Sequence, residues 1–500
     1  DSLEHLKDIN NGFKGEIFTM KKTKLFVLSA AALVTIGALA GCNNGGAAKG
    51  AVAKIIEEAQ KMDEAELYKK AMEEINGKKF TVVANSSRMK DAAPAWMEYV
   101  KGTEGKGGEN FEYKDANFAF TFATTQPKNN QIFAQIKADV TGANHNIAMT
   151  LIQDGSQIKN KMTKTGYLLN YIPKGWEEQG GNKLKDGEPL ALQSLSKVFC
   201  YNKGSDTPEY KNVWNFAIDL NTQFMTPASE PVGQNFLYML TKPEYAKYVK
   251  DAYDALDAKR KEYVDDLIAG KEYKFENGDF VLSGGAKQSN GETGIAELMA
   301  DGGFEDDVKY SLAWTYAFLK HYTAVSDDGP ISQNITQKSA KGSAGLLVYS
   351  KFRSIQESED VSVKPIEVAA YQDGYVGFGG YMYKHYLQIL STSPYPWTSC
   401  ALIHFMTMHQ EGFQPWGKDA GGYSSNPTVQ ACEAFDHSRD GNKKDENGNK
   451  TDEVEFKVKN DKGYTWWTGT ANNQGRLVLE DGEYCTKVAA TMAEWIQYLR

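Results

Sequence analysis

Polar side chains that follow predicted strands are the residues whose type and spacing could hold a ligand. They form two matching groups, Ser86, Ser87 and Arg88 after the apolar run 79–84, and Asp154, Gly155 and Ser156 after the strand predicted at 146–153. Each group also precedes a predicted helix, whose free N–H groups and dipole favour anions and polar groups. Hydroxyls and a guanidinium there suit an anion, and a carboxylate suits a cation or sugar hydroxyls. Ordinary helix capping is the alternative for both groups.

Two further places offer weaker candidates for ligand contact. Ser289, Asn290 and Thr293 lie in the glycine-rich stretch 284–294, where glycine lets a backbone approach a ligand closely. A plain loop is the alternative reading. Trp214 has a ring that could stack on a ligand, although burial in the core is the favoured alternative.

Catalytic motifs are absent from the sequence. It contains no GxSxG elbow, no HExxH and no P-loop. His404 and His409 lie five residues apart in a predicted helix at 398–409, which is poor spacing for a shared metal and favours a place in the core. We therefore expect no catalytic residues, no metal site and no cofactor. Paired carboxylates cannot be placed by sequence, so a carbohydrate hydrolase remains the alternative.

Residues 20–41 have the organisation of a secretory signal. Lysines follow Met20, an apolar run extends over 25–40, and the run ends in Leu39-Ala40-Gly41-Cys42, which resembles the bacterial lipobox. That motif implies diacylglyceryl transfer to the Cys42 thiol, palmitate-type acylation and cleavage before it. An uncleaved anchor is the alternative. Residues 1–19 precede Met20 and read as an upstream, non-native segment.

Composition describes a globular chain of 500 residues with a net charge of −9. The acidic balance and the lack of a basic stripe argue against nucleic-acid binding. Four cysteines follow Cys42, namely Cys200, Cys400, Cys432 and Cys485. They lack CxxC spacing, so they predict no zinc site and leave disulfides or free thiols open.

Strands and helices alternate through the first half of the chain. After a flexible glycine-rich tether within 42–51, a helix is predicted at 52–75, followed by strands near 79–84, 119–124 and 146–153 with helices between them. This alternation favours a mainly parallel sheet with helices on its faces. Helices predominate later, at 235–240, 244–269, 294–301, 308–321 and 487–499. The polar stretch 436–453 reads as an exposed loop or hairpin insertion.

Several segments together resemble the extracellular solute-binding proteins of ABC importers, in the group that includes ferric-ion and polyamine binders. They are 81–88, 131–139 with 151–155, 166–173, 198–202, 393–397, 401–406 and 410–416. The resemblance covers most of the chain after Cys42 and rests on the order of these loose motifs.

The resemblance implies an α/β, two-lobed periplasmic-binding-protein fold of class II, which closes on its ligand like a flytrap. It places the first part of lobe 1 at 52–200, lobe 2 at 201–362, and a return to lobe 1 with C-terminal helices at 363–500. Tyr201 and Tyr371 then lie near the two crossings between the lobes, as hinge or cleft residues.

The implied function is a lipid-anchored, monomeric receptor on the extracytoplasmic face of the cell membrane, which delivers a small solute to ABC importer permease subunits. The sequence lacks the adjacent tyrosines typical of ferric binders, which disfavours iron. An adhesin is disfavoured because neither repeats nor long β-rich segments are present.

Overall fold

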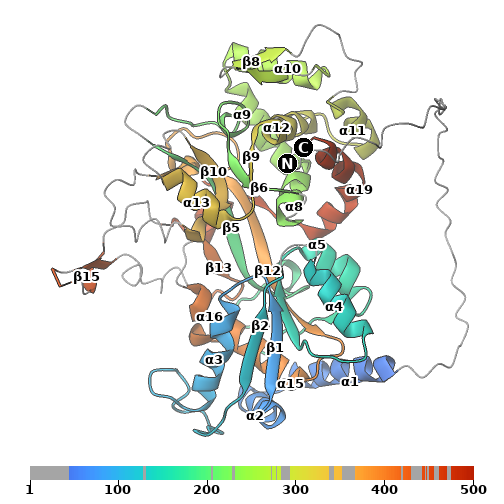
Figure 1. Cartoon of the computed structure of the whole chain (residues 1–500), viewed down its shortest axis with the longest axis vertical. Helices are drawn as coiled ribbons and strands as arrows, with labels where there is room; N and C mark the ends of the chain where they lie inside the picture. Colours follow the sequence, from blue (N-terminus) through green and yellow to red (C-terminus); the bar gives the residue numbers. More distant parts are fainter. Residues whose placement is uncertain are drawn as a thin grey trace, which may run out of the picture. The chain divides into compact units, whose positions relative to one another are not determined.

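The computed structural model describes most of the chain from Asn44 to Leu499 (Figure 1). The described residues are 44–499 except 128–130, 204–206, 228–230, 272, 277–278, 283–292, 337–342, 352–365, 418–420, 430–441, 445, 448–449, 455–460 and 470–473. No helix among them combines the length and the apolar character that crossing a membrane requires.

Two long antiparallel strands form the centre of the structure. β5 (Ala191–Asn202) pairs with β12 (Gly380–Leu390), from Gly380 opposite Val198 to Tyr386 opposite Ala191. Figure 1 shows them side by side, and we call this pair the central ribbon. Every residue of β5 is buried, and β12 is buried except at Lys384. The ribbon therefore passes through the interior and is shared by the sheets on either side.

The first lobe is a sheet with the strand order β2-β1-β3-β12. β1 (Lys79–Ala84) is parallel to β2 (Thr121–Thr125) and to β3 (Met149–Ile152), and β12 is antiparallel to β3. Both faces are covered. Val82 packs into a core with helices α2, α3 and α15, and Val83 packs with α4 on the other face. Burial on both faces explains the near-continuous apolar run of β1.

The second lobe repeats this order. β9 (Thr323–Val325), β6 (Gln223–Met225) and β10 (Ala344–Val348) lie in the order β9-β6-β10, and β5 closes the row antiparallel to β10. In each lobe, therefore, the strand that comes first in the chain lies between the second and the third, and an antiparallel strand of the central ribbon lies beside the third. Three cores accompany the two sheets, one in the second lobe and two in the first. This confirms the predicted two-lobed α/β fold.

Helices complete both lobes. Those in the first half of the chain are α1 (Asn44–Ala59), α2 (Glu64–Ile75), α3 (Met89–Val100), α4 (Gln131–Thr141), α5 (Gly155–Gln157), α6 (Lys183–Asp186), α7 (Asn215–Ile218) and α8 (Pro231–Met239). The later ones are α9 (Pro243–Asp254), α10 (Ala258–Ile268), α11 (Ile295–Gly302), α12 (Val308–His321), α13 (Asp328–Thr336), α15 (Pro396–Met408), α16 (Gln410–Gly417), α18 (Tyr464–Thr468) and α19 (Gly482–Tyr498).

Short strands and turns make up the remaining elements. The strands are β4 (Leu168–Leu169), β7 (Tyr273–Glu276), β8 (Asp279–Leu282), β11 (Ile366–Val368), β13 (Gly422–Ser424), β14 (Asn442–Lys444), β15 (Lys450–Val454) and β16 (Val478–Leu479). A π-helical turn spans Ile158–Thr163, and 3₁₀ turns span Tyr349–Lys351 and Ala369–Tyr371. β14 and β15 pair antiparallel with each other.

Several boundaries differ from the sequence-based expectation. The predicted glycine-rich tether lies largely inside α1, because alanines and the following amphipathic run extend the helix back to Asn44. The helix predicted at 52–75 is interrupted between α1 and α2, where Asp63 has extended backbone angles. The helix predicted at 244–269 is likewise two helices, since Asp257 caps α10 by accepting a hydrogen bond from Arg260 N (2.9 Å).

The late part of the chain also departs from expectation. β12 was not predicted, and the lobe boundary expected after residue 200 falls inside β5. The sequence-based division grouped the C-terminal helix with the first lobe. In the structure, α19 contacts α8 and α11, which belong to the core of the second lobe, and it also contacts α5. Cys200, Cys400 and Cys485 are buried free thiols, and Cys432 lies outside the described residues.

Gly380 begins β12 in a conformation that requires glycine, with φ of 151°. A Cβ there would lie 2.0 Å from the carbonyl oxygen of Lys197 on β5. We expect Gly380→Ala to lower the free energy of unfolding by about 1–3 kcal/mol through backbone strain alone, and further through this clash. Urea unfolding measures the loss.

Gly77→Ala is the matched control. Gly77 also has positive φ (73°), but no atom lies within 4 Å of a Cβ placed there. It should lose only about 1–2 kcal/mol, the ordinary cost of a left-handed residue. Equal losses in the two variants would show that close strand contact at Gly380 does not constrain the ribbon.

Candidate functional site

A cavity of about 450 Å³ lies between the two lobes, against the central ribbon. Its first-lobe wall includes the segments that follow β1, β2 and β3, and its second-lobe wall comes from the end of β6 and from the segments that follow β9 and β10. Parallel strands in one sheet end at the same edge, so these loops are collected around one opening. We call this cavity the cleft.

The ribbon supplies the floor of the cleft through every second residue. Gln193, Leu195 and Lys197 of β5 line it, as do Tyr383 and His385 of β12. Successive side chains of a strand point to opposite faces. The intervening residues Ser194, Met382, Lys384 and Tyr386 accordingly line a second cavity of about 410 Å³ behind the ribbon.

Lys197 and Asp328 form an ion pair in the cleft floor. The Lys197 Nζ lies 3.0 and 2.9 Å from the two carboxylate oxygens of Asp328, and both side chains are almost fully buried. Asp328 begins α13 and also accepts a hydrogen bond from Val348 N (3.3 Å). Because a buried charge without its partner is costly, the pair fixes the start of α13 against the ribbon.

His385 lies between two glutamines in the same floor. Its Nε2 is 2.9 Å from Gln153 Nε2, and its Nδ1 is 3.1 Å from Gln193 Nε2. Burial lowers the pKa of His385 to about 3, so the ring is neutral at physiological pH. Both contacts are made by amide nitrogens, and a neutral imidazole has one acceptor nitrogen, so the ring accepts a hydrogen bond from one of the two glutamines. His385 therefore orients amides and is a poor proton acceptor.

The loop after β1 is held from two sides. Ser86 Oγ accepts a hydrogen bond from Trp416 Nε1 (3.1 Å), and Arg88 Nη1 donates to the carbonyl of Pro415 (2.5 Å). Asn85 Oδ1 accepts from the backbone N–H of Gln153 (2.8 Å). Ser87 is exposed. The predicted group Ser86, Ser87 and Arg88 thus lines the cleft, where Arg88 adds positive charge.

The second predicted group lies outside the lining of the cleft. Asp154 is buried with φ of 72° and caps α5 by accepting from Gln157 N (3.1 Å). Gly155 lines the cavity behind the ribbon, and Ser156 Oγ pairs with Thr486 Oγ1 (2.7 Å). Capping, the alternative considered for this group, describes the position of Asp154.

Four other predicted residues are buried away from the cleft because their polar atoms bond within the core. Tyr201 OH donates to Gln372 Oε1 (2.9 Å), Trp214 Nε1 to Val249 O (3.2 Å) and Thr293 Oγ1 to Leu267 O (3.0 Å). Tyr371 OH lies 3.1 Å from Tyr349 OH. Ser289 and Asn290 lie outside the described residues.

Sequence reasoning missed the residues of the floor. The available signal was the segment 380–390, in which Lys384 and His385 interrupt an otherwise apolar and aromatic run. A charged residue inside a buried strand requires a partner, which marks such positions for attention. Asp328 carried no comparable local signal, since its partner Lys197 is far away in the sequence.

Neither the protein-family models nor the curated proteins searched match this sequence. Among solved structures, the chain is similar to iron-bound HitA of Pseudomonas aeruginosa, with 10% identity and a TM-score of 0.42 over 70% of this chain and 88% of that chain. It is similar to an ABC transporter substrate-binding protein of Bradyrhizobium japonicum (10%, TM-score 0.46, 85% and 100%). It is also similar to the spermidine/putrescine substrate-binding protein PotD of Streptococcus pneumoniae (11%, 0.43, 85% and 100%). These likenesses are distant, so the functional argument rests on the cleft itself.

Behind the ribbon, one asparagine joins two acidic residues. Asn235 Nδ2 of α8 donates to Asp154 Oδ1 and to Glu480 Oε1, both at 3.0 Å, and Tyr386 OH donates to Glu480 Oε2 (3.3 Å). Burial, together with repulsion from Asp154, raises the pKa of Glu480 to about 7. Burial also raises the pKa of Asp154. This contact therefore links the end of β3 in the first lobe to α8 in the second.

Glu480 should make stability depend on pH. Its pKa rises from 4.5 to about 7 on folding, so the folded state binds more protons between these values and stability falls as pH rises through them. We expect Glu480→Gln to remove up to about 3 kcal/mol of this loss, measured by urea unfolding from pH 4.5 to 8. Glu483→Gln, at a neighbouring residue whose side chain is 83% exposed, is the control and should retain the wild-type slope. An unchanged slope in Glu480→Gln would contradict the assignment.

Proposed function

We propose that this chain is an extracytoplasmic receptor that captures a small polar solute between its lobes and delivers it to the permease of an ABC importer. The supporting observation is the cleft, which is lined by both lobes and by the ribbon that connects them. A solute held there contacts both lobes at once, so its binding energy favours approach of the lobes. Hinge closure of this kind is a common route to ligand capture.

The chemistry of the lining indicates a polar solute. Its polar members are Asn85, Ser86, Ser87, Arg88, Gln126, Gln153, Gln193, Lys197, Ser326, Asp327, Asp328, Ser350, Lys351 and His385. Tyr383 and Trp416 add aromatic surface. Amides and hydroxyls both donate and accept, which suits a solute with several such groups. Tyr383 is the single tyrosine among the described residues of this lining, which offer little phenolate for ferric ion.

The same lining favours a receptor over the alternative hydrolase. Glycoside hydrolysis uses two carboxylates on opposite sides of the scissile bond. The carboxylates that line the cleft, Asp327 and Asp328, are neighbours in sequence on the second-lobe wall, and Asp328 is paired with Lys197. Neither faces a carboxylate of the first-lobe wall among the described lining residues.

Lipid attachment at Cys42 belongs to this proposal. An acylated Cys42 would hold the receptor at the extracytoplasmic face of the membrane, where permease subunits are reached by short diffusion. Two or more acyl chains give stable anchoring, since each buried methylene contributes about 0.8 kcal/mol. A monomer suffices, because both walls of the cleft come from one chain.

Ligand binding in the cleft should be detectable by thermal shift with sugars, polyamines, amino acids and oxyanions. A solute at 100 times its Kd should stabilise the protein by about 2.7 kcal/mol. Ser87→Trp should abolish this shift by occupying the cleft, while leaving the unliganded melting temperature almost unchanged because Ser87 is exposed.

Ala134→Trp, on the exposed face of α4, is the matched control and should bind like the wild type. A shift that persists in Ser87→Trp would place the ligand elsewhere. Turnover of a hit by the purified protein, or the absence of any hit across these classes, would count against the receptor function.

Cys42→Ser should abolish incorporation of labelled fatty acid in a bacterial host, since the serine hydroxyl does not replace the thiolate as acceptor. The protein should then be recovered without detergent. The control is Cys200→Ser, at a buried thiol of β5, which should retain the label. Labelling of Cys42→Ser equal to the wild type would refute the predicted lipid anchor.

A further inference from the structure

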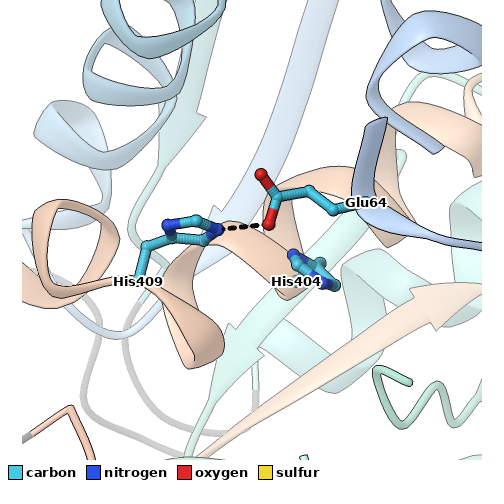
Figure 2. A group of neighbouring side chains, drawn as sticks. All are labelled: Glu64, His404 and His409. Carbon is cyan, nitrogen blue, oxygen red and sulfur yellow. Dashed lines mark hydrogen bonds and ion pairs between the residues drawn. The ribbon is translucent and has the colours of Figure 1, made fainter. Parts of the chain in front are cut away.

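Glu64, His404 and His409 form a cluster in the first lobe, away from the residues that line the cleft. Their ligand atoms all lie within 4.8 Å of one another. Figure 2 shows Glu64 reaching from the start of α2 toward the two histidines, with the carboxylate between the rings. His409 Nε2 lies 2.7 Å from Glu64 Oε2.

The end of α15 explains how the two histidines converge. On a continuous helix, residues five apart point about 140° away from each other, which is why the sequence disfavoured a joint site. α15 ends at Met408, however, and His409 has extended backbone angles (φ −119°, ψ 140°). The chain therefore leaves the helix between the two rings, and the expectation that their spacing prevents convergence is wrong.

Aromatic hydroxyls orient two of the three side chains. Tyr68 OH lies 3.0 Å from His404 Nδ1, and Tyr99 OH donates to Glu64 Oε1 (2.9 Å). Among the described contacts, the tyrosines do not engage the second nitrogen of His404 or Glu64 Oε2, which His409 Nε2 approaches. Outer hydrogen bonds of this kind fix the tautomer and orientation of metal-binding histidines and carboxylates.

We propose that Glu64, His404 and His409 bind a divalent transition-metal ion, for which zinc is the best match. Two imidazoles and one carboxylate are a usual zinc donor set, with bonds of about 2.0–2.2 Å and a water as fourth ligand. Access is open on one side, because the side chains of Glu64 and His409 are 32% and 20% exposed. Calcium and magnesium prefer oxygen ligands and fit poorly.

The ion would join the N-terminal part of the lobe to its late part. α2 and α15 pack against each other, and Glu64 and His404 are 340 residues apart in sequence. Metal bridging adds a bond across this helix pair in the folded state only, so bound zinc should stabilise the lobe.

The test is zinc binding to the chelator-treated full chain, by isothermal titration with metal analysis after dialysis. We expect one equivalent of Zn²⁺ at Glu64, His404 and His409 and a raised melting temperature. His409→Gln and Glu64→Gln should each weaken binding at least about 100-fold, since even the loss of a hydrogen-bond partner of a metal ligand costs about 10 to 100-fold. His145→Gln, at a partly exposed histidine of the same lobe that lies outside the cluster, should bind like the wild type.

Cobalt provides a second readout that does not depend on stability. Co²⁺ in a four-coordinate site should give visible absorption in the wild type and in His145→Gln, and none in His409→Gln. The proposal is overturned if the folded wild type binds no stoichiometric zinc, if both cluster variants retain it, or if Mg²⁺ or Ca²⁺ displaces it at equal concentration. A zinc site that is lost in the variants while solute binding persists separates this site from the cleft.

Discussion

The pairing of β5 with β12 is the constraint on which the rest of the structure depends. β12 completes the sheet of the first lobe and β5 completes the sheet of the second. One strand of each sheet therefore also connects the two lobes. The two-residue period of a strand then divides their side chains between two faces. Lys197, Tyr383 and His385 floor the cleft, and Lys384 and Tyr386 line the cavity behind it. A register shift of one residue would exchange these two sets.

Local signals in the sequence were sufficient for much of the first lobe. The apolar run 79–84 is buried on both faces of a parallel sheet, and its end marks the loop 85–88 that lines the cleft. The helix predicted at 308–321 matches α12 because nine of its fourteen residues are apolar or aromatic and recur at helical spacing. β12 was missed because it mixes aromatic, charged and apolar residues, each satisfied by contacts that are distant in sequence.

The same limit applies to the site. Asp154 and Ser87 both follow strands and precede helices. The Asp154 carboxylate, however, accepts hydrogen bonds from Gln157 N and from Asn235 Nδ2, whereas Ser87 lines the cleft. The cap to Gln157 is local, but the packing of α8 against the first lobe, which brings Asn235 to Asp154, is not encoded locally. The opposite holds for His404 and His409. Their spacing would point the two side chains apart on a continuous helix, but the helix ends between them and the side chains come together.

The two walls of the cleft carry unlike charge. Lys197 and Asp328 neutralise each other in the floor, which leaves Arg88 with amides on one wall and Asp327 with Lys351 on the other. Among the described lining residues, Arg88 is the charged side chain of the first-lobe wall, whereas the second-lobe wall carries both signs. If the cleft binds a solute as we propose, a molecule with an anionic end and a neutral end would meet different partners at the two walls, which would give its binding one preferred orientation.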